Sequence, residues 1–251
     1  MSPSRIHQNI KIHPLPWENR PMESNDISAK MRDYLMEIYR LSEHNPTDHS
    51  YVSTSVLADL LDVTAPAVNR MVTRLKEQGL LQHEPYQGIR LTDAGKHEAL
   101  VKLRRHRIIE SFLVKVMQFE WQEVFQEASN MSSGLSESLT QRMLEMAGNP
   151  THCPHGEPIP SADGHIEIMG DMLLSEAETG VDLVVTRVLT READRLSYLA
   201  ALGLMPGAEL AVIHVAPFSG PMQLKLDGEY RIIGYNLAET IKVTPVSTTT
   251  R

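Results

Sequence analysis

Residues 53–79 constrain the fold of this chain most, because they encode two short helices joined by a tight turn. The first segment, STSVLADLLDV, carries apolar residues at helical spacing that we expect to face inward: Val56, Leu57, Leu60 and Leu61. The second segment has Thr64 as a candidate N-cap, Pro66 in its first turn and Gly79 at its end. Together they predict a helix-turn-helix.

A short hairpin and a local excess of basic residues follow this motif. In LLQHEPYQGIRLT, two strand-like runs flank Gln87-Gly88, which is typical of the wing of a winged helix. The whole chain has a formal net charge of −8, but basic side chains outnumber acidic ones from Thr64 to Arg107. The basic residues there are Arg70, Arg74, Lys76, Arg90, Lys96, Lys102, Arg104, Arg105 and Arg107, against Glu77, Glu84, Asp93 and Glu98. Basic charge segregated in this way favours contact with the DNA backbone.

The N-terminal end of the second helix is where base contacts are expected, because this end enters the major groove in a helix-turn-helix. The candidate residues are Thr64, Pro66, Ala67, Asn69 and Arg70. Asn and Arg can form paired hydrogen bonds with adenine and guanine, and Pro and Ala offer apolar surface to thymine methyl groups. Arg74, Lys76 and the wing residue Arg90 are better placed for phosphates. The alternative is a helical fold with an ordinary solvated basic face.

The flanking segments predict a mainly helical chain with a small β domain. Apolar periodicity predicts a helix over 27–41 and further helices from Asp93 to about Gly148. Near the C-terminus, short β-rich runs between turn signals predict a small antiparallel barrel: VDLVVTRVL, AELAVIHVA, MQLKLD, YRIIG and IKVTPV. The expected divisions are a disordered tail at 1–26, domains at 27–95 and 96–150, a linker at 151–174 and a domain at 175–247.

The cysteine content and the hydropathy of the sequence indicate the cellular compartment. The single cysteine, Cys153, excludes an intramolecular disulfide and fits a reducing cytoplasm. No apolar run approaches the roughly 18–20 residues that span a bilayer. We therefore expect a cytoplasmic protein without membrane contacts.

Two groups of potential metal ligands lie outside the DNA-binding region. His106 and Glu110 are four residues apart on one helical face, which suits either half of a divalent-metal site or a simple surface ion pair. The HCPHG loop offers His152, Cys153 and His155, but this spacing is too tight for a structural zinc site by itself. The sequence favours a linker there.

The run EASNMSSGLSESLT, at residues 127–140, places serines beside an apolar helical stripe. These serines are Ser129, Ser132, Ser133 and Ser136. Spacing alone leaves three interpretations of the strip open: a solvated face, a close-packed face or a site.

The order of these features resembles the diphtheria toxin repressor and manganese-dependent regulator family. The matching text is DYLMEIYRL, LADLLDVTAPAVNRMVTRLKEQGL, IRLTDAGK, RRHRIIESFL and CPHGEPIP, and the part from LGLMPGAELAVI to GYNLAETIKV resembles the SH3-like domain of ferrous-transport accessory proteins. The resemblance covers about 27–245. It implies a winged helix, a helical dimerisation domain and an SH3-like β-barrel. It also implies homodimers that bind palindromic operators, with DNA affinity switched by Mn(II) or Fe(II).

The resemblance also assigns metal ligands. It places them at Asp33, His106, Glu110 and the barrel residue Glu192, whose usual Gln partner is Arg195 here. The family pattern E-A-(Cys or Glu)-x-x-Glu-His falls on residues 127–133, so Ser129, Ser132 and Ser133 occupy three ligand positions. The position sometimes filled by His is Phe125.

Because neutral hydroxyls are weak ligands for Mn(II) and Fe(II), the serines predict that metal sensing is weakened or lost. We accordingly predict a homodimeric DNA-binding repressor and not an enzyme. One alternative is a partner- or ligand-binding regulator with no metal response, which the basic bias of 64–107 disfavours. The other is a metal-dependent enzyme using His106, Glu110, His152 and His155, which lacks a recognisable base or nucleophile.

Overall fold

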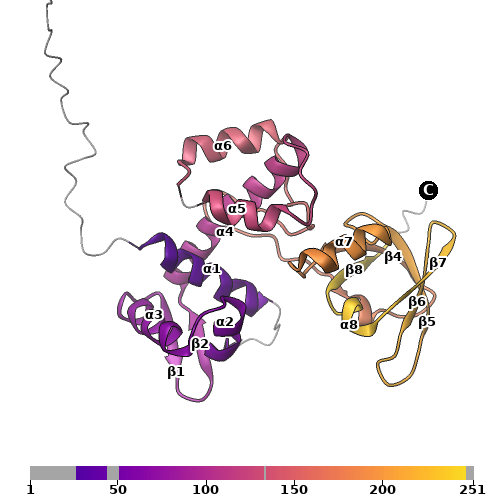
Figure 1. Ribbon diagram of the computed structural model, residues 1–251, viewed down its shortest axis with the longest axis horizontal. Helices are drawn as coiled ribbons and strands as arrows, with labels where there is room; N and C mark the ends of the chain where they lie inside the picture. Colours follow the sequence, from indigo (N-terminus) through magenta and orange to yellow (C-terminus); the bar gives the residue numbers. More distant parts are fainter. Residues whose placement is uncertain (1–26, 44–50, 133, 247–251) are drawn as a thin grey trace, which may run out of the picture.

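The computed structural model describes residues 27–43, 51–132 and 134–246. The tail at 1–26 and Ser133 lie outside these ranges, so the predicted disorder of the tail stays a prediction. The described residues form a winged helix-turn-helix, a helical segment and a β domain (Figure 1). No helix among them is long and apolar enough to cross a membrane.

The winged helix consists of three helices and a hairpin. Its elements are α1 (Ala29–Glu43), α2 (Thr54–Leu60), α3 (Ala65–Glu77), β1 (Leu81–Glu84) and β2 (Gly88–Leu91). Thr64 is the N-cap of α3, and Gly79, with a φ of 70°, follows this helix in the left-handed conformation that glycine tolerates. Glu84 pairs with Gly88, so the hairpin turn is at 85–87. The predicted helix-turn-helix and wing are confirmed.

The helix α2 buries less apolar surface than its sequence predicts. Leu57 and Ala58 enter the core, whereas Val56 is 48% exposed and Leu60 is 51% exposed. Val56 and Leu60 lie four residues apart on a neighbouring face of this seven-residue helix, and that face is turned to solvent. The prediction that both face inward is wrong.

The helical segment contains α4 (Asp93–Lys115), α5 (Val124–Ser132) and α6 (Glu137–Met146). The first half of α4 packs into the winged-helix core through Ala99 and Leu103. Its second half packs with α5 and α6 through Ile108 and Leu113. One continuous helix of 23 residues therefore connects the DNA-binding part to the rest of the molecule.

The serine strip is divided between two helices. Ser129 and Ser132 lie on α5, whereas Ser136 is the N-cap of α6 and accepts a hydrogen bond of 3.3 Å from the Leu139 N–H. Ser136 therefore has a structural explanation. Only Ser129 and Ser132 remain as described candidates for a site.

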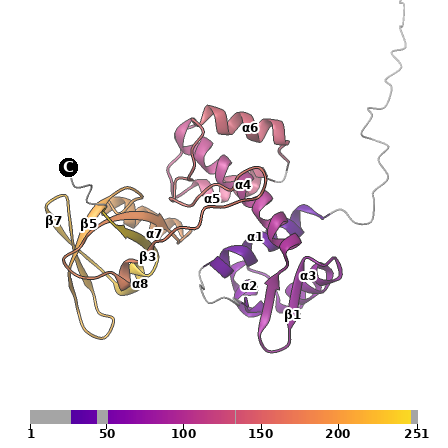
Figure 2. The ribbon, with the colours of Figure 1, turned by 180° about the vertical axis from the view of Figure 1, so that it is seen from behind.

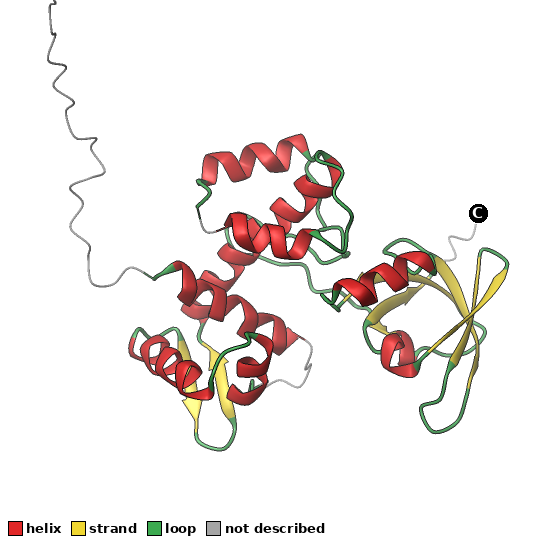
Figure 3. Ribbon diagram, viewed as in Figure 1, coloured by secondary structure: helices red, strands yellow, loops and turns green. Residues whose placement is uncertain are grey.

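The β domain is one antiparallel sheet with two short helices (Figures 2 and 3). Its elements are β3 (Met172–Leu173), η1 (Leu174–Glu176), β4 (Asp182–Val188), α7 (Ala193–Ala201), β5 (Glu209–Val215), β6 (Met222–Leu226), β7 (Glu229–Ile233), α8 (Tyr235–Ala238) and β8 (Ile241–Pro245). The strand order is β3-β8-β4-β5-β6-β7. Register shifts between Val185 and Arg187 and between Val212 and His214 let the sheet curl around its core. The five predicted strands are confirmed, and β3 is an additional one.

The Pro- and His-rich loop at residues 149–161 packs between α4 and the β domain. Arg107 of α4 donates a hydrogen bond of 2.7 Å to the Pro158 carbonyl. At Gly156, where φ is 83°, an added Cβ would lie 1.9 Å from the Thr186 carbonyl oxygen of β4. Only glycine allows this approach, which fixes the loop against the sheet. In Figures 1 and 2 the β domain accordingly lies beside the helical segment.

Candidate functional site

The helix α3 has a buried side and an exposed polar side. Val68, Val72 and Leu75 close the winged-helix core. Of the predicted base-reading residues, Ala67 is half-exposed and the others are exposed: Thr64, Pro66, Asn69 and Arg70. The phosphate candidates Arg74 and Lys76, further along the helix, are also exposed. The geometry thus leaves the N-terminal end of α3 open to a DNA groove.

The wing holds its predicted basic residue in place. Arg90 of β2 donates from Nε to Gln82 Oε1 at 2.8 Å, and its guanidinium carbon lies 5.6 Å from the centre of the Tyr51 ring. At the tip of the wing, Tyr86 is fully exposed with a φ of 66°. Tyr86 was not identified from the sequence as a candidate DNA contact, although an aromatic residue in a hairpin turn could have indicated it.

A second site is buried beneath the loop at 149–161. His106 and Glu110 of α4 and His155 of the loop are fully buried, and Cys153 is nearly so. Glu110 Oε1 lies 3.3 Å from His106 Nε2 and 3.7 Å from His155 Nδ1. One ligand atom each of Glu110, Cys153 and His155 lie within 4.8 Å of one another. We call these four residues the buried cluster. His106 and Glu110 therefore do not form a surface ion pair, and Cys153 and His155 join them although the sequence favoured a linker.

The protonation states in the buried cluster follow mainly from burial. Burial lowers the pKa of His106 and lowers that of His155 to about 4, and it raises the pKa of the Cys153 thiol to about 12. Burial also acts to raise the pKa of Glu110, but His106, His155 and Arg191 outweigh it and hold this pKa well below its usual range. Without a cation, the cluster is a carboxylate beside two neutral imidazoles.

One hydrogen bond determines which nitrogen of His155 faces Glu110. Its Nε2 lies 3.0 Å from the Trp121 carbonyl oxygen, which can only accept, so Nε2 carries the proton of the neutral ring. Nδ1 therefore presents a lone pair to the Glu110 carboxylate. Two acceptors facing each other at 3.7 Å need a cation or a donor between them.

The residues of the buried cluster fit a transition-metal ion. Both carboxylate oxygens of Glu110, both ring nitrogens of His106 and Nδ1 of His155 lack a hydrogen bond of regular geometry within the described ranges. Unsatisfied buried polar atoms are costly. Carboxylate, imidazole and thiolate are suitable donors for Mn(II), Fe(II) and Zn(II), and coordination deprotonates a thiol even when its free pKa is high.

A neighbouring ion-pair network positions this loop. Glu157 pairs with Arg107 at 2.9 Å and with Arg191 of the β domain. Burial acts to raise the pKa of Glu157, but the two guanidinium groups lower it far below its usual value. His152, by contrast, lies outside the buried cluster and pairs with Glu167 at 3.6 Å. The four residues of the hypothetical enzyme site are therefore not all brought together.

The other predicted metal position, at Asp33 and the serines of α5, has a different chemistry. Ser129 donates its hydroxyl to the Phe125 carbonyl at 3.0 Å, and Ser132 donates to the Ser129 carbonyl at 3.1 Å. Lys102 Nζ lies 2.7 Å from Ser132 Oγ and 2.8 Å from Asp33 Oδ1. The donors there are engaged with each other and with an ammonium group, so these described residues do not fit a divalent metal.

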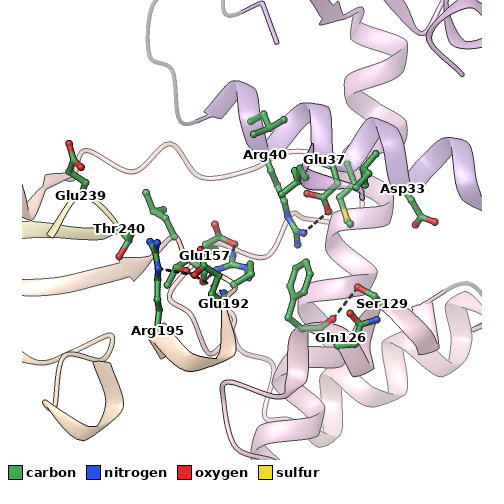
Figure 4. A pocket seen from close by; sticks show the side chains of 18 residues that line it. Asp33, Glu37, Arg40, Gln126, Ser129, Glu157, Glu192, Arg195, Glu239 and Thr240 are labelled. Atoms are coloured by element: carbon green, nitrogen blue, oxygen red, sulfur yellow. Dashed lines mark hydrogen bonds and ion pairs between the residues drawn. The ribbon is translucent and has the colours of Figure 1, made fainter. Parts of the chain in front are cut away.

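Glu192 of the barrel stays apart from the buried cluster. It is the N-cap of α7, and its side chain is 65% exposed and pairs with Arg195 at 2.8 Å. Figure 4 shows Glu192 and Arg195 across a pocket of about 790 Å³ from Asp33 and Ser129. Phe125, at the position sometimes filled by His in the family, packs against His106 with ring centres 4.9 Å apart and ring planes tilted by 59°.

Three family models match the chain. "Iron dependent repressor, N-terminal DNA binding domain" matches residues 26–89, "Iron dependent repressor, metal binding and dimerisation domain" matches 92–161, and "FeoA domain" matches 172–245. The chain belongs to the iron-dependent repressor family. This family consists of DNA-binding transcriptional repressors and not enzymes, so the predicted resemblance and function class are confirmed.

Individual relatives agree with this assignment. The iron-dependent repressor IdeR of Mycobacterium leprae (strain TN) is 28% identical over 235 residues, which cover 88% of this chain and 100% of the relative. An uncharacterized HTH-type transcriptional regulator of Methanocaldococcus jannaschii is 32% identical over 117 residues, or 47% of this chain and 91% of the relative. A solved manganese-dependent transcriptional repressor in complex with manganese has a TM-score of 0.79 at 31% identity, covering 86% of this chain and 100% of that one.

Proposed function

We propose that this chain is a cytoplasmic repressor that binds a palindromic operator as a homodimer, without requiring a metal at the Asp33 position. The observation that carries the proposal is that Lys102 pairs with Asp33 at 2.8 Å, beside hydroxyl groups at the ligand positions. Hydroxyls and a fixed positive charge give a divalent cation little to bind. Family membership supplies the DNA-binding and dimerisation domains.

In this proposal the exposed end of α3 reads the operator. Asn69 and Arg70 reach base edges, and Thr64, Pro66 and Ala67 complete the contact surface. Arg74 and Arg90 contact phosphates, together with Lys76. A homodimer would place two such helices about 34 Å apart, so the half-sites would repeat roughly every 10 base pairs.

The metal function that the donor set supports lies in the buried cluster. Glu110, Cys153 and His155 would hold a single divalent ion, with His106 adjacent. When bound, such an ion supplies the positive charge that the buried carboxylate lacks. The chain's own contribution is to orient His155 through Trp121. Since the donors join α4 to the loop at 149–161, we expect the ion to stabilise this junction and not to switch operator affinity.

A DNA-selection experiment with the full chain tests the repressor proposal. The selection is run in chelator and, in parallel, with added Mn(II), Fe(II) or Zn(II), and the oligomeric state is measured by analytical ultracentrifugation. We expect one palindromic sequence to be enriched under all conditions by a dimer. Failure to enrich any sequence would refute DNA reading, and enrichment only with metal would refute metal independence.

Equilibrium dialysis with each of the three metals tests the buried cluster. We expect the wild type to bind one ion per subunit, and we expect this binding to be lost in Glu110→Gln and retained in Asp33→Asn. The glutamine substitution keeps the size of the side chain and removes its charge. If Asp33→Asn released the ion and Glu110→Gln did not, the metal would belong to the Asp33 position and the assignment would be wrong.

A further inference from the structure

Lys102 is a buried cation at the junction of three helices. It lies on α4 and is 4% exposed. Its Nζ lies 2.8 Å from Asp33 Oδ1 of α1 and 2.7 Å from Ser132 Oγ of α5, and Ser132 is fully buried. Lysine is almost never buried without a charged partner, so this arrangement demands a specific explanation.

The carboxylate of Asp33 and the hydroxyl of Ser132 suit an ammonium group better than a divalent ion. An ammonium group carries one charge and up to three donors, which one carboxylate and a neutral hydroxyl can satisfy. Ser132 Oγ accepts from Lys102 and donates to the Ser129 carbonyl, so both of its roles are used. Carboxylates at positions 129 and 132 would instead leave an excess of negative charge beside a single ammonium group. Neutral serines at these positions therefore suit a lysine at position 102, because the single ammonium group then faces a single carboxylate.

We propose that the Lys102 ammonium group is a built-in replacement for the regulatory cation: it holds α1 of the winged helix against α5, whatever the metal concentration. The inference rests on the proposed function, because it names what replaces metal control in this repressor. Asp33 belongs to the DNA-binding part and Ser132 to the helical segment. A covalently attached cation between them keeps the reading helices in one orientation, and operator affinity becomes constitutive.

A loss-of-function pair tests this role. Lys102→Met and Asp33→Asn each remove one charge of the pair with little change in volume. We expect each to weaken operator affinity about tenfold or more, both in chelator and with added metal, measured by fluorescence anisotropy. The matched control is Arg32→Gln, which removes a different α1–α4 ion pair, Arg32 with Glu98 at 2.8 Å, that does not reach α5. Its cation is 37% exposed, against 4% for Lys102, whereas its carboxylate is 23% exposed, against 43% for Asp33. The control should stay within about twofold of wild type.

Circular dichroism and thermal unfolding establish that each variant is folded. A folded Lys102→Met protein with operator affinity within about twofold of wild type would overturn the proposal, because it would show that the winged helix is held in its DNA-binding orientation without the contacts of Lys102 to Asp33 and Ser132.

A gain-of-function comparison tests the same idea without DNA. In a Glu110→Gln background, which removes the buried-cluster site, Ser129→Glu and Ser132→Glu are introduced with Lys102 retained or changed to Met. Isothermal titration with Mn(II) should detect binding only when Lys102 is absent, with affinity at least about tenfold above the Lys102-retaining protein. Equal Mn(II) affinity in the two proteins would contradict replacement of the cation by Lys102. If the wild type bound no DNA, the proposed function would be refuted. The Mn(II) titration would still show whether Lys102 occupies the place of the cation.

Discussion

Arg70 and Arg74 lie one turn apart on α3, yet their distances from the N-terminal end of that helix differ. Both side chains are exposed and available to DNA. If the N-terminal end of α3 meets the base edges, as we propose, a guanidinium at residue 70 would reach a guanine and one at residue 74 would reach the backbone. The two positions should therefore behave differently on substitution.

Arg70→Ala should cost about 1–3 kcal/mol of operator binding and relax the preference at one base position. Arg74→Ala should weaken binding to all sequences alike and reduce the salt dependence by about one counterion. Anisotropy titrations with operator and scrambled DNA at several salt concentrations measure both effects. An unchanged sequence profile for Arg70→Ala would remove this residue from base reading.

The low pKa of His155 predicts that the metal-free protein loses stability in mild acid. Its pKa is lowered from 6.5 to about 4 in the folded state, so the unfolded chain takes up the proton first as the pH falls. This contribution is fully present above about pH 6.5 and declines toward pH 4, by up to roughly 3 kcal/mol at about 1.4 kcal/mol per pH unit. His106 acts in the same direction.

Urea unfolding in chelator across this pH range measures the effect, and His155→Gln should flatten the curve. The carboxylates Glu110 and Glu157, whose pKa values are lowered in the folded state, begin to lose their contribution only as the pH falls toward their ordinary pKa of 4.5. The upper part of the window, from about pH 6.5 to pH 5, therefore reports mainly on the histidines. A wild-type stability that stayed constant from pH 7 to pH 4 would show that His155 is not buried in its neutral form.

At the scale of elements, α4 organises the molecule. Lys102, His106 and Glu110 lie four residues apart along one stripe of α4, so the ammonium junction and the buried cluster follow one another on the same helix face. The N-terminal half of this helix completes the winged-helix core. A bend in α4 would therefore disturb the DNA-binding part and both polar centres together.

The wing is the second element that we propose contacts DNA. Tyr86 at its tip is fully exposed and contributes nothing to the core, so its replacement should leave stability unchanged. If the wing lies on the flanking backbone, Tyr86→Ala should weaken operator binding by about threefold to tenfold while the sequence preference is retained. Gel-shift titration against a selected library tests both parts. An unchanged affinity would place the wing tip away from DNA.

Much of the fold could be predicted because local signals agree with the tertiary structure. The caps of α3, the turn of the wing and the alternating strands of the β domain are encoded within short windows of sequence. The burial of Leu57 but not of Val56 and Leu60 could not be read in this way, since helical spacing alone does not reveal which face is covered.

The candidate site was predicted only in part, for a similar reason. His106 and Glu110 are neighbours on one helix, and their pairing follows from spacing. Cys153 and His155 reach Glu110 only because the loop at 149–161 folds back over α4, which no local pattern encodes. The role proposed for Lys102 likewise depends on Asp33 of α1 and Ser132 of α5 both reaching its ammonium group, although the serines at the expected ligand positions of α5 were visible in the sequence.

At the scale of the whole molecule, the two polar centres connect different parts of the chain, and we propose a separate function for each. The ammonium junction connects the DNA-binding part to the helical segment, whereas the buried cluster connects the helical segment to the loop that packs on the β domain. The Lys102 ammonium group is part of the first, and we propose that the second is where a metal ion binds from solution. Metal should therefore change the stability of this repressor and leave its DNA affinity almost untouched.

The most direct test is the operator affinity of the wild-type protein, measured by anisotropy after chelation and again after saturation with Mn(II) or Fe(II). The account predicts tight, salt-dependent binding in chelator and a change of less than about threefold when metal is added. A gain of about tenfold or more on metal addition would contradict it, because that result requires the metal switch which Lys102 and the serines of α5 are proposed to have replaced.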